Sequence, residues 1–224
     1  SEFIRQYIVT VISPIPVALS YSGRVINGSF ISAWVNGSSV ISIIIPRYYI
    51  FNNGTRLMYI GNNESMVVNS PLSINLPLSE FTRQYMITVS SPVPVLVSIP
   101  GMPLYNTTSL SMWVNSSLTM SVLAPRYYMF NNGTRLIYTG VNRTFTVNEP
   151  LSINIPWSSF TRQYMVTVSS PVPITLTVLN APIASGLTVS TWINSSLTIN
   201  ILVPKYYTFN NDTRLIYMGS NESL

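Results

Sequence analysis

The sequence has 224 residues, of which 47% are hydrophobic and only 8% are charged, with a net charge of +5 and neither His nor Cys. This composition excludes a disordered chain, and it removes the commonest general base, the commonest metal ligand and the thiolate nucleophile. The six carboxylates form no close pair, so we predict no enzyme activity and no catalytic, cofactor-binding or metal site. Lys and Arg are dispersed, which argues against a nucleic-acid partner. No apolar run reaches the roughly 18 residues of a membrane span.

One stretch occurs three times, at residues 47–61, 126–140 and 205–219, and each copy starts 79 residues after the previous one. The middle copy reads RYYMFNNGTRLIYTG. A long, fixed period indicates repeated structural units. We therefore predict three tandem repeats, at residues 1–78, 79–157 and 158–224.

Each repeat opens with Phe-x-Arg-Gln-Tyr, at residues 3–7, 81–85 and 160–164, followed by a strand in which apolar and polar residues alternate. Ser-Pro-x-Pro comes next, and because Pro cannot donate to a ladder, this segment should lie on an edge or at a switch between sheets. Trp-x-Asn follows after a variable loop. We expect the Trp of each repeat to lie in the core of a sandwich, rather than to bind sugars. These residues are Trp34, Trp113 and Trp192.

The stretch that occurs three times predicts a β-hairpin, because Asn-Asn-Gly between two apolar runs favours a turn with positive φ. Asp212 replaces Gly54 and Gly133 in the third copy, and Asp tolerates the left-handed region. Two adjacent Tyr residues precede each turn and must point to opposite faces. One Tyr of each pair should therefore lie near the surface and pair with a neighbouring Arg or Leu.

Each of the first two repeats closes with Pro-Leu-Ser-Ile-Asn, at residues 71–75 and 150–154. About seven short strands per repeat predict an all-β fold of three tandem immunoglobulin-like antiparallel β-sandwich repeats of about 79 residues. The links between repeats are short and contain Pro, so the array should be stiff. In the third repeat Leu224 aligns with Met66 and Phe145, before the closing strand. Because natural proteins avoid open edges, we expect this strand to follow Leu224 in a longer repeat protein, with at least one further repeat before Ser1 or after that strand.

The Asn-x-Ser/Thr acceptor for N-glycans occurs up to four times in each repeat. The Asn stays at equivalent positions of the repeats while the middle residue of the triplet changes, so we predict covalent N-glycans at these sites. The acceptors are Asn27, Asn36, Asn53, Asn63, Asn106, Asn115, Asn132, Asn142, Asn194, Asn211 and Asn221.

The succession of Gln-Tyr-x-x-Thr-Val-x-Ser-Pro, Trp-x-Asn and Tyr-x-Phe-Asn-Asn-Gly-Thr-Arg resembles the immunoglobulin-like repeats of archaeal, especially crenarchaeal, cell-surface proteins. Such repeats occur in surface-layer stalk proteins, in extracellular filaments and as appendages of secreted proteases. The resemblance covers all three repeats and implies an extracellular, glycosylated spacer or assembly module. The scarcity of carboxylates leaves little for acid to titrate, which suits the exterior of a thermoacidophile.

The first hypothesis for function is a non-enzymatic structural protein of the cell exterior, a rigid N-glycosylated array that forms a filament or part of a surface layer. Its partners would be copies of itself or further repeats of the same chain, together with other surface-layer proteins. Two alternatives remain open: an adhesin or glycan-binding module that uses the exposed Tyr residues, and a non-catalytic appendage of a secreted hydrolase.

Overall fold

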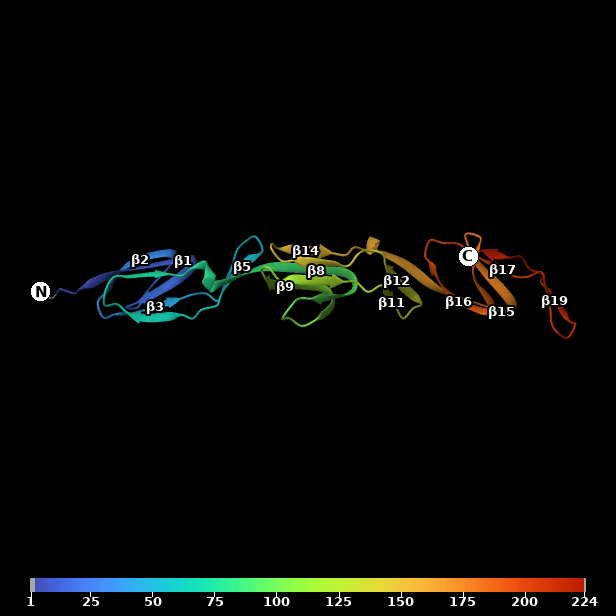
Figure 1. Ribbon diagram of the computed structural model, residues 1–224, viewed down its shortest axis with the longest axis horizontal. Helices are drawn as coiled ribbons and strands as arrows, with labels where there is room; N and C mark the ends of the chain where they lie inside the picture. The colour runs from blue at the N-terminus through green and yellow to red at the C-terminus, as the bar shows by residue number, and fades with distance from the viewer. Residues whose placement is uncertain (1–2, 224) are drawn as a thin grey trace.

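The structure is a computed structural model that describes residues 3–223, and it shows an all-β chain extended along one axis (Figure 1). The first repeat contains β1 (Gln6–Tyr21), β2 (Arg24–Asn36), β3 (Val40–Ile44), β4 (Tyr48–Ile50), β5 (Thr55–Tyr59), β6 (Glu64–Val67) and β7 (Leu72–Asn75). The second contains β8 (Phe81–Ser98), β9 (Tyr105–Asn115), β10 (Thr119–Leu123), β11 (Tyr127–Met129), β12 (Thr134–Tyr138), β13 (Arg143–Thr146) and β14 (Leu151–Asn154). The third contains β15 (Phe160–Val178), β16 (Ala181–Asn194), β17 (Ile199–Leu202), β18 (Tyr206–Thr208), β19 (Arg214–Ile216) and β20 (Glu222–Ser223). Two 3-10 turns, η1 (Leu78–Glu80) and η2 (Trp157–Ser159), lead into β8 and β15. The predicted all-β class is confirmed, and the mainly antiparallel sheets are consistent with a β-sandwich.

Three long strands, β1, β8 and β15, run along the axis of the molecule (Figure 1). In the second repeat, β9 pairs with β8 along one edge. The other edge of β8 is shared by three shorter strands: β5 pairs with its beginning, β14 with its middle and β10 with its end. A single strand of 18 residues thus connects elements from two repeats.

The Ser-Pro-x-Pro segments lie inside these long strands and mark a change of strand partner. The register between β1 and β2 shifts between Ile12 and Val17. Before the shift β1 pairs with β7, and after it with β3. The hydroxyl of Ser13 accepts a hydrogen bond of 3.3 Å from the backbone N–H of Ile15, which gives that donor a local partner between the two prolines. The segment therefore lies neither on an edge nor at a switch between sheets, which were the two places predicted, but at a change of strand partner within one sheet.

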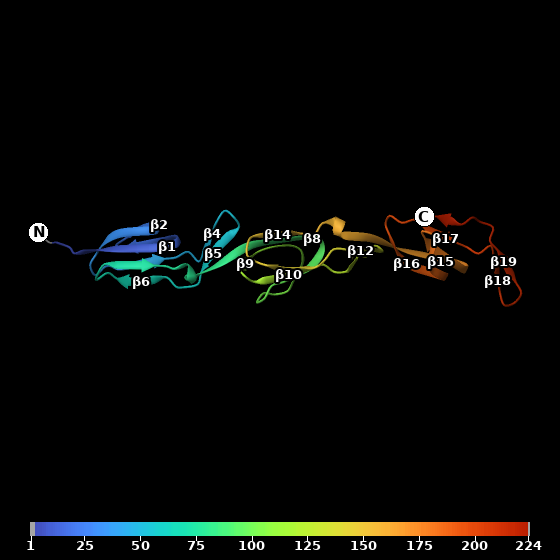
Figure 2. The same cartoon turned by 45° about the horizontal axis from the view of Figure 1, so that its top comes forward.

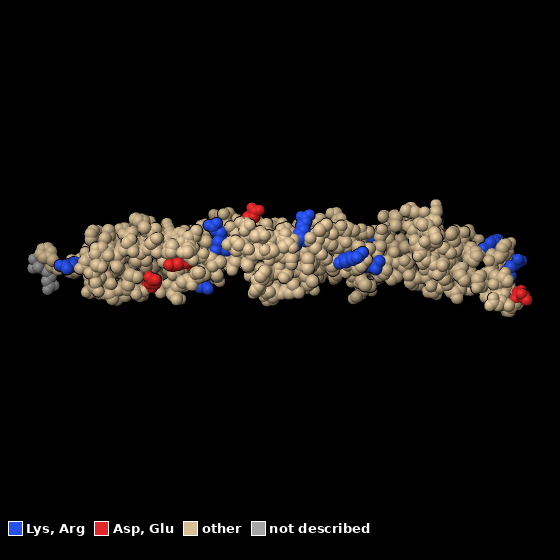
Figure 3. All heavy atoms as spheres, in the orientation of Figure 1, with Lys and Arg blue, Asp and Glu red and all other residues tan. Residues whose placement is uncertain are grey.

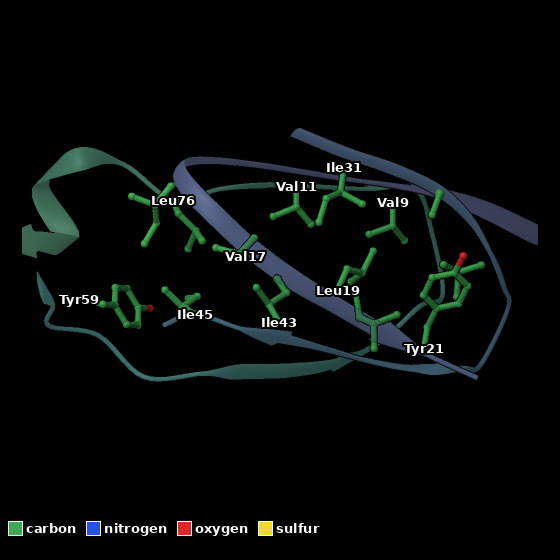
Figure 4. Packing of buried hydrophobic residues seen from close by; sticks show 14 of the residues in the cluster. Val9, Val11, Val17, Leu19, Tyr21, Ile31, Ile43, Ile45, Tyr59 and Leu76 are labelled. Atoms are coloured by element: carbon green, nitrogen blue, oxygen red, sulfur yellow. The ribbon is translucent and has the colours of Figure 1, made fainter. Parts of the chain in front are cut away.

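The largest hydrophobic core lies in the first repeat (Figure 4). Every second side chain of β1 from Val9 to Tyr21 is buried, and Ser13 is the only polar one among them. Ile31 of β2 and Ile43 of β3 pack against this row. Full burial of one such aliphatic side chain is worth about 1.5–3 kcal/mol. Uninterrupted alternation is therefore what makes so long a strand stable.

Strands β7 and β14 pair in parallel with β1 and β8, an addition to the antiparallel arrangement predicted from the sequence. A parallel pair needs a crossover, and residues 68–71 carry the chain from β6, beside β3, to β1. Val68, at the start of this segment, and Leu76, directly after β7, are buried in the core. The described residues of the third repeat form no equivalent strand, and their core cluster has three buried residues, Ile174, Leu176 and Val189, which is far smaller than the cluster of the first repeat. The closing strand expected beyond Leu224 lies outside the described residues.

Each hairpin of the first two repeats joins its repeat to the next one. β4 pairs with β5, and β5 pairs with β8 of the second repeat. β11, β12 and β15 repeat this arrangement (Figures 1 and 2). The turns have the predicted positive φ, of +74° at Gly54, +71° at Gly133 and +59° at Asp212. The hairpins are confirmed, and their hydrogen bonding extends the sheet of the following repeat.

Candidate functional site

The described surface holds few groups able to do chemistry. Charged side chains are few and spread along the length of the molecule on the face shown in Figure 3, without a large basic or acidic patch on that face. Residues 3–223 contain no group of three or more His, Cys, Asp or Glu side chains that could hold a metal ion. A hollow of about 410 Å³ on the second repeat is lined by one cationic side chain, Arg143, and by no carboxylate. In the same range, no helix is long and apolar enough to span a membrane.

The most connected polar arrangement lies between the first and second repeats. Arg56 of β5 donates from Nε to Oε1 of Gln84 at 2.6 Å, and Gln84 donates from Nε2 to Oδ1 of Asn115 at 2.7 Å. The Arg56 guanidinium carbon lies 4.7 Å from the ring centroid of Trp113 and 4.3 Å from that of Tyr48. We call these five residues the inter-repeat joint. One cation is thereby held by a charge-assisted hydrogen bond and two aromatic rings.

The same joint forms again between the second and third repeats. Arg135 donates to Gln163 at 2.6 Å, and Gln163 donates to Asn194 at 2.7 Å. The Arg135 guanidinium carbon lies 4.5 Å from the ring of Trp192 and 5.0 Å from that of Tyr127. Agreement between the two joints to within 1 Å shows that the repeat itself encodes this geometry.

Strand register explains why these side chains meet. Arg56 lies opposite Gln84 in the pairing of β5 with β8, and Gln84 lies opposite Asn115 in the pairing of β8 with β9. Residues directly opposite one another share a face of the sheet, so the three side chains form a line across three strands. Gln84 is only 7% exposed, and both ends of its amide are hydrogen-bonded. A buried and satisfied amide holds its neighbours in one geometry.

Burial at the joint lowers the pKa of Arg56 from its usual value, and the nearby Tyr48 acts in the opposite direction. An arginine remains charged in proteins at any ordinary pH. The joint therefore keeps its cation in acid as well as at neutral pH.

The prediction that the Trp residues fill the cores is wrong. Trp34 is 63% exposed, and Trp113 and Trp192 are half-buried outside the buried clusters. The reason is strand alternation, because the next residue along each strand is the one that points inward. Val35 and Val114, which follow two of these Trp residues, are 1% and 0% exposed. An aliphatic side chain occupies the inward position, and Trp113 and Trp192 face the Arg of the preceding repeat.

The prediction for the Tyr pairs is confirmed. Tyr48, Tyr127 and Tyr206 are about half exposed, whereas the second Tyr of each pair is half-buried. Each exposed Tyr lies beside an Arg of the same hairpin, at 4.3 to 5.0 Å from the ring centroid to the guanidinium carbon. Pairing across the two hairpin strands therefore accounts for these residues.

The predicted glycan acceptors are accessible to different degrees. Those at the first, third and fourth positions of the repeats are exposed: Asn27, Asn53, Asn63, Asn106, Asn132, Asn142, Asn211 and Asn221. The three at the second position, Asn36, Asn115 and Asn194, are half-buried. The exposed acceptors are therefore the better placed for modification by an enzyme.

Hydrogen bonds give most of these Asn residues a structural role as well. At the second position the amide oxygen accepts from the Gln of the opening motif, which is Gln6, Gln84 or Gln163. At the third position, on the hairpin tips, it accepts from the backbone N–H two residues later, as in Asn53 with Thr55 at 3.1 Å. At the fourth position the amide oxygen accepts a hydrogen bond from the backbone N–H of the residue directly after the strand that follows Trp-x-Asn. Asn63, for example, accepts from Ile45, directly after β3, at 2.9 Å. All of these bonds use Oδ1, and glycans attach to the other atom, the amide nitrogen. Retention of Asn thus has two compatible causes.

Sequence reasoning did not find the joint, although every member of it was a repeated residue. Arg56 was noted in the hairpin, Gln84 in the opening motif and Trp113 and Asn115 in Trp-x-Asn. The sequence did contain a signal for the joint, because the Arg, Gln and Asn of these three motifs are unchanged in every repeat. Comparison with protein-family models, with curated proteins and with solved structures found no match to this chain.

Proposed function

We propose that this chain is a structural protein of the cell exterior, in which a rigid, N-glycosylated repeat array forms a filament or part of a surface layer. The observation that carries the proposal is the inter-repeat joint, because it extends the sheet of one repeat with the hairpin of the previous one. Such a joint transmits load and orientation along the axis. A binding or catalytic role would need convergent polar groups in a pocket, and the polar groups here converge between repeats.

The joint supports rigidity through main-chain as well as side-chain bonds. Five residue pairs connect β5 with β8. Ile60 donates its backbone N–H to the carbonyl of Glu80 at 3.0 Å, and Glu80 donates to Pro77 at 3.0 Å within η1. The net worth of one such hydrogen bond is about 0.5–1.5 kcal/mol. Together they fix the angle between neighbouring repeats, which a short linker alone would leave free to bend.

Glycosylation suits the surface that this fold exposes. Val25 and Phe30 flank the acceptor Asn27 and are 59% and 66% exposed. Leu104, two residues before Asn106, is 63% exposed. With so few charges available for solubility, sugars at these acceptors would cover apolar side chains and keep the array from aggregating.

The test is an analysis of native material by electron microscopy together with glycopeptide mass spectrometry. We expect filaments or a lattice in the images. We expect glycans at Asn53, Asn132 and Asn211, which lie on hairpin tips and are exposed. Occupancy should be lower at Asn115 and Asn194, which lie inside joints and so form the matched internal comparison. Native chains that are dispersed and unmodified at all three hairpin tips would contradict the proposal.

A further inference from the structure

The tip of the first hairpin, residues 51–55, is a closed turn that holds a predicted glycan acceptor. The backbone N–H of Phe51 donates to the carbonyl of Thr55 at 2.9 Å. Oδ1 of Asn53 accepts from the backbone N–H of Thr55 at 3.1 Å, which leaves Nδ2 for a glycan. The turns at residues 130–134 and 209–213 repeat both bonds, and φ is positive at the fourth residue of all three turns. The acceptor Asn therefore has the same setting in each repeat.

A phenylalanine stands two residues before each of these acceptors: Phe51, Phe130 and Phe209. Each ring makes a T-shaped contact with the Tyr two residues before it, with ring centroids 5.0, 5.0 and 5.1 Å apart. Phe51 is half-buried and packs partly against the core of the first repeat. The contact with Tyr fixes the ring, and its remaining surface is open to another group next to the acceptor.

A hollow of about 400 Å³ lies at the tip of the first hairpin. The hairpin contributes the acceptor Asn53 itself, together with Phe51 and Thr55, and the second repeat contributes Arg83, Tyr85 and Pro150. Arg83 is exposed, and Tyr85 is half-buried. An acceptor, an aromatic ring beside it and side chains of the following repeat thus share one hollow.

The hollow and the inter-repeat joint lie on opposite faces of the same two strands. In the pairing of β5 with β8, Thr55 lies opposite Tyr85 and Leu57 lies opposite Arg83, and all four line the hollow. Arg56, the cation of the joint, lies between Thr55 and Leu57, so its side chain points to the other face. A group that fills the hollow can therefore contact both repeats without displacing the joint.

We infer that the first sugar of the N-glycan on Asn53 lies in this hollow, packs against the ring of Phe51 and contacts Arg83 and Tyr85 of the second repeat. This inference rests on the glycosylation in the proposed function. Attachment forms a bond between Nδ2 and the anomeric carbon of a glycan that is activated as a phosphate ester. The phosphate leaves with the bonding electron pair, and Nδ2 loses one proton.

The chemistry of the lining suits a sugar. The C–H groups of a pyranose ring pack on an aromatic face, which carries partial negative charge. Its hydroxyls need hydrogen-bond partners, and the guanidinium of Arg83 and the hydroxyl of Tyr85 can supply them. Apolar walls with a few polar groups are typical of sites for small molecules. Because Asn53 is itself part of the wall, the attached sugar has a high effective concentration at the hollow, unlike a free saccharide.

The consequence is a glycan that stiffens the array. The sugar is covalently attached to a hairpin of the first repeat and makes its other contacts with β8 of the second. It therefore adds a second connection between these repeats, on the face of the sheet opposite Arg56. Bending at this position then requires the sugar to leave the hollow.

Nuclear magnetic resonance tests the position of the sugar. The probe is a single N-acetylglucosamine residue on Asn53 of the whole chain, with the unmodified chain as reference. We expect nuclear Overhauser effects from the sugar to the ring protons of both Phe51 and Tyr85. The sugar C–H resonances should also be shifted upfield by the ring of Phe51, and Phe51→Leu should abolish this shift.

Urea unfolding of the same chains measures the stabilisation. Phe51→Leu keeps an apolar side chain at this site, so the variant should fold. We expect the sugar to lower the unfolding equilibrium constant of the parent chain about two- to tenfold more than that of Phe51→Leu. Phe81→Leu is the matched control, because Phe81 belongs to the same core, is only 7% exposed and does not line the hollow. In Phe81→Leu the sugar should have the same effect as in the parent chain.

Two results would overturn the inference. One is a stabilisation by the sugar that is equal in the parent chain and in Phe51→Leu. The other is a sugar on Asn53 that gives no nuclear Overhauser effect to Tyr85. Both measurements use a sugar installed on the chain, whereas glycan occupancy and assembly are measured on native material. Either result would therefore leave the proposed function standing.

Discussion

Replacing Arg135 with Ala should uncouple the second repeat from the third. The substitution removes a charge-assisted hydrogen bond of 2.6 Å to Gln163 and a contact of 4.5 Å with the ring of Trp192. The first is worth about 1.5–3 kcal/mol and the second about 0.5–2 kcal/mol. Because the two contacts share one side chain and part of the rotamer cost, we expect a loss of about 2–4 kcal/mol in the free energy of unfolding.

The assay is a urea titration followed by tryptophan fluorescence and by far-ultraviolet circular dichroism. Trp192 reports directly on the joint, because it lies against the substituted side chain. The matched control is Arg214→Ala in dilute solution, since Arg214 occupies the same position of a hairpin that closes no joint in the described chain. In a repeat array, the coupling between neighbours is a separate contribution to stability, so only Arg135→Ala should split the transition into two.

Equal effects of the two substitutions would refute this reasoning. That result would mean that each Arg acts through the Tyr of its own hairpin, with no contribution from the following repeat. A double substitution of Arg135 and Trp192 separates the contributions further. The coupling free energy of residues in direct contact is about 0.5–3 kcal/mol. A value near zero would show that the contact between Arg135 and Trp192 does not stabilise the joint.

Two further predictions follow from the burial pattern and from the pKa of one tyrosine. Trp113→Ala should lower the free energy of unfolding by about 1–2 kcal/mol, because the side chain is half-buried over Arg56. Ile87→Ala, at a side chain with 0% exposure, should lower it by about 2–5 kcal/mol. Urea titrations in which Trp113→Ala is the more destabilising of the two would show that Trp113 belongs to the core. Burial, and then the negative charges of Glu80 and Glu64, raise the pKa of Tyr59 above its usual value. A raised pKa in the folded state contributes stability that is present below the unfolded pKa of about 10 and is lost as pH rises through the folded pKa. In Tyr59→Phe, the thermal midpoint should therefore fall less steeply with pH above about pH 10 than in the parent chain. Tyr138→Phe is the matched control, because Tyr138 has the same position in the next repeat but Ser159 stands in place of Glu80. An equally steep fall in the parent and in Tyr59→Phe would contradict the assignment.

Local chemistry in the sequence was enough to predict the class of the fold, although it predicted short strands where β1, β8 and β15 have 16, 18 and 19 residues. Alternation of apolar residues predicted the strands, since successive side chains of a strand point to opposite faces. Asn-Asn-Gly predicted the hairpins, and φ is positive at Gly54 and Gly133. The prolines have no N–H to donate and so predicted an edge or a switch between sheets, whereas the structure shows a change of strand partner within one sheet. Each of these rules depends on neighbours in the sequence, so the sequence by itself determined these features.

The pairing of one repeat with the next was decided only by the tertiary structure. Arg56 and Gln84 are 28 residues apart, and Gln84 and Asn115 are 31 apart. Their meeting depends on the register of three strands, which no local pattern specifies. The position of Trp113 has the same origin: alternation shows that Trp113 and Val114 face opposite ways, but not which of them faces the core. That choice depends on which side of the sheet the rest of the repeat covers, and it places Val114 inside and Trp113 against the arginine of the preceding repeat.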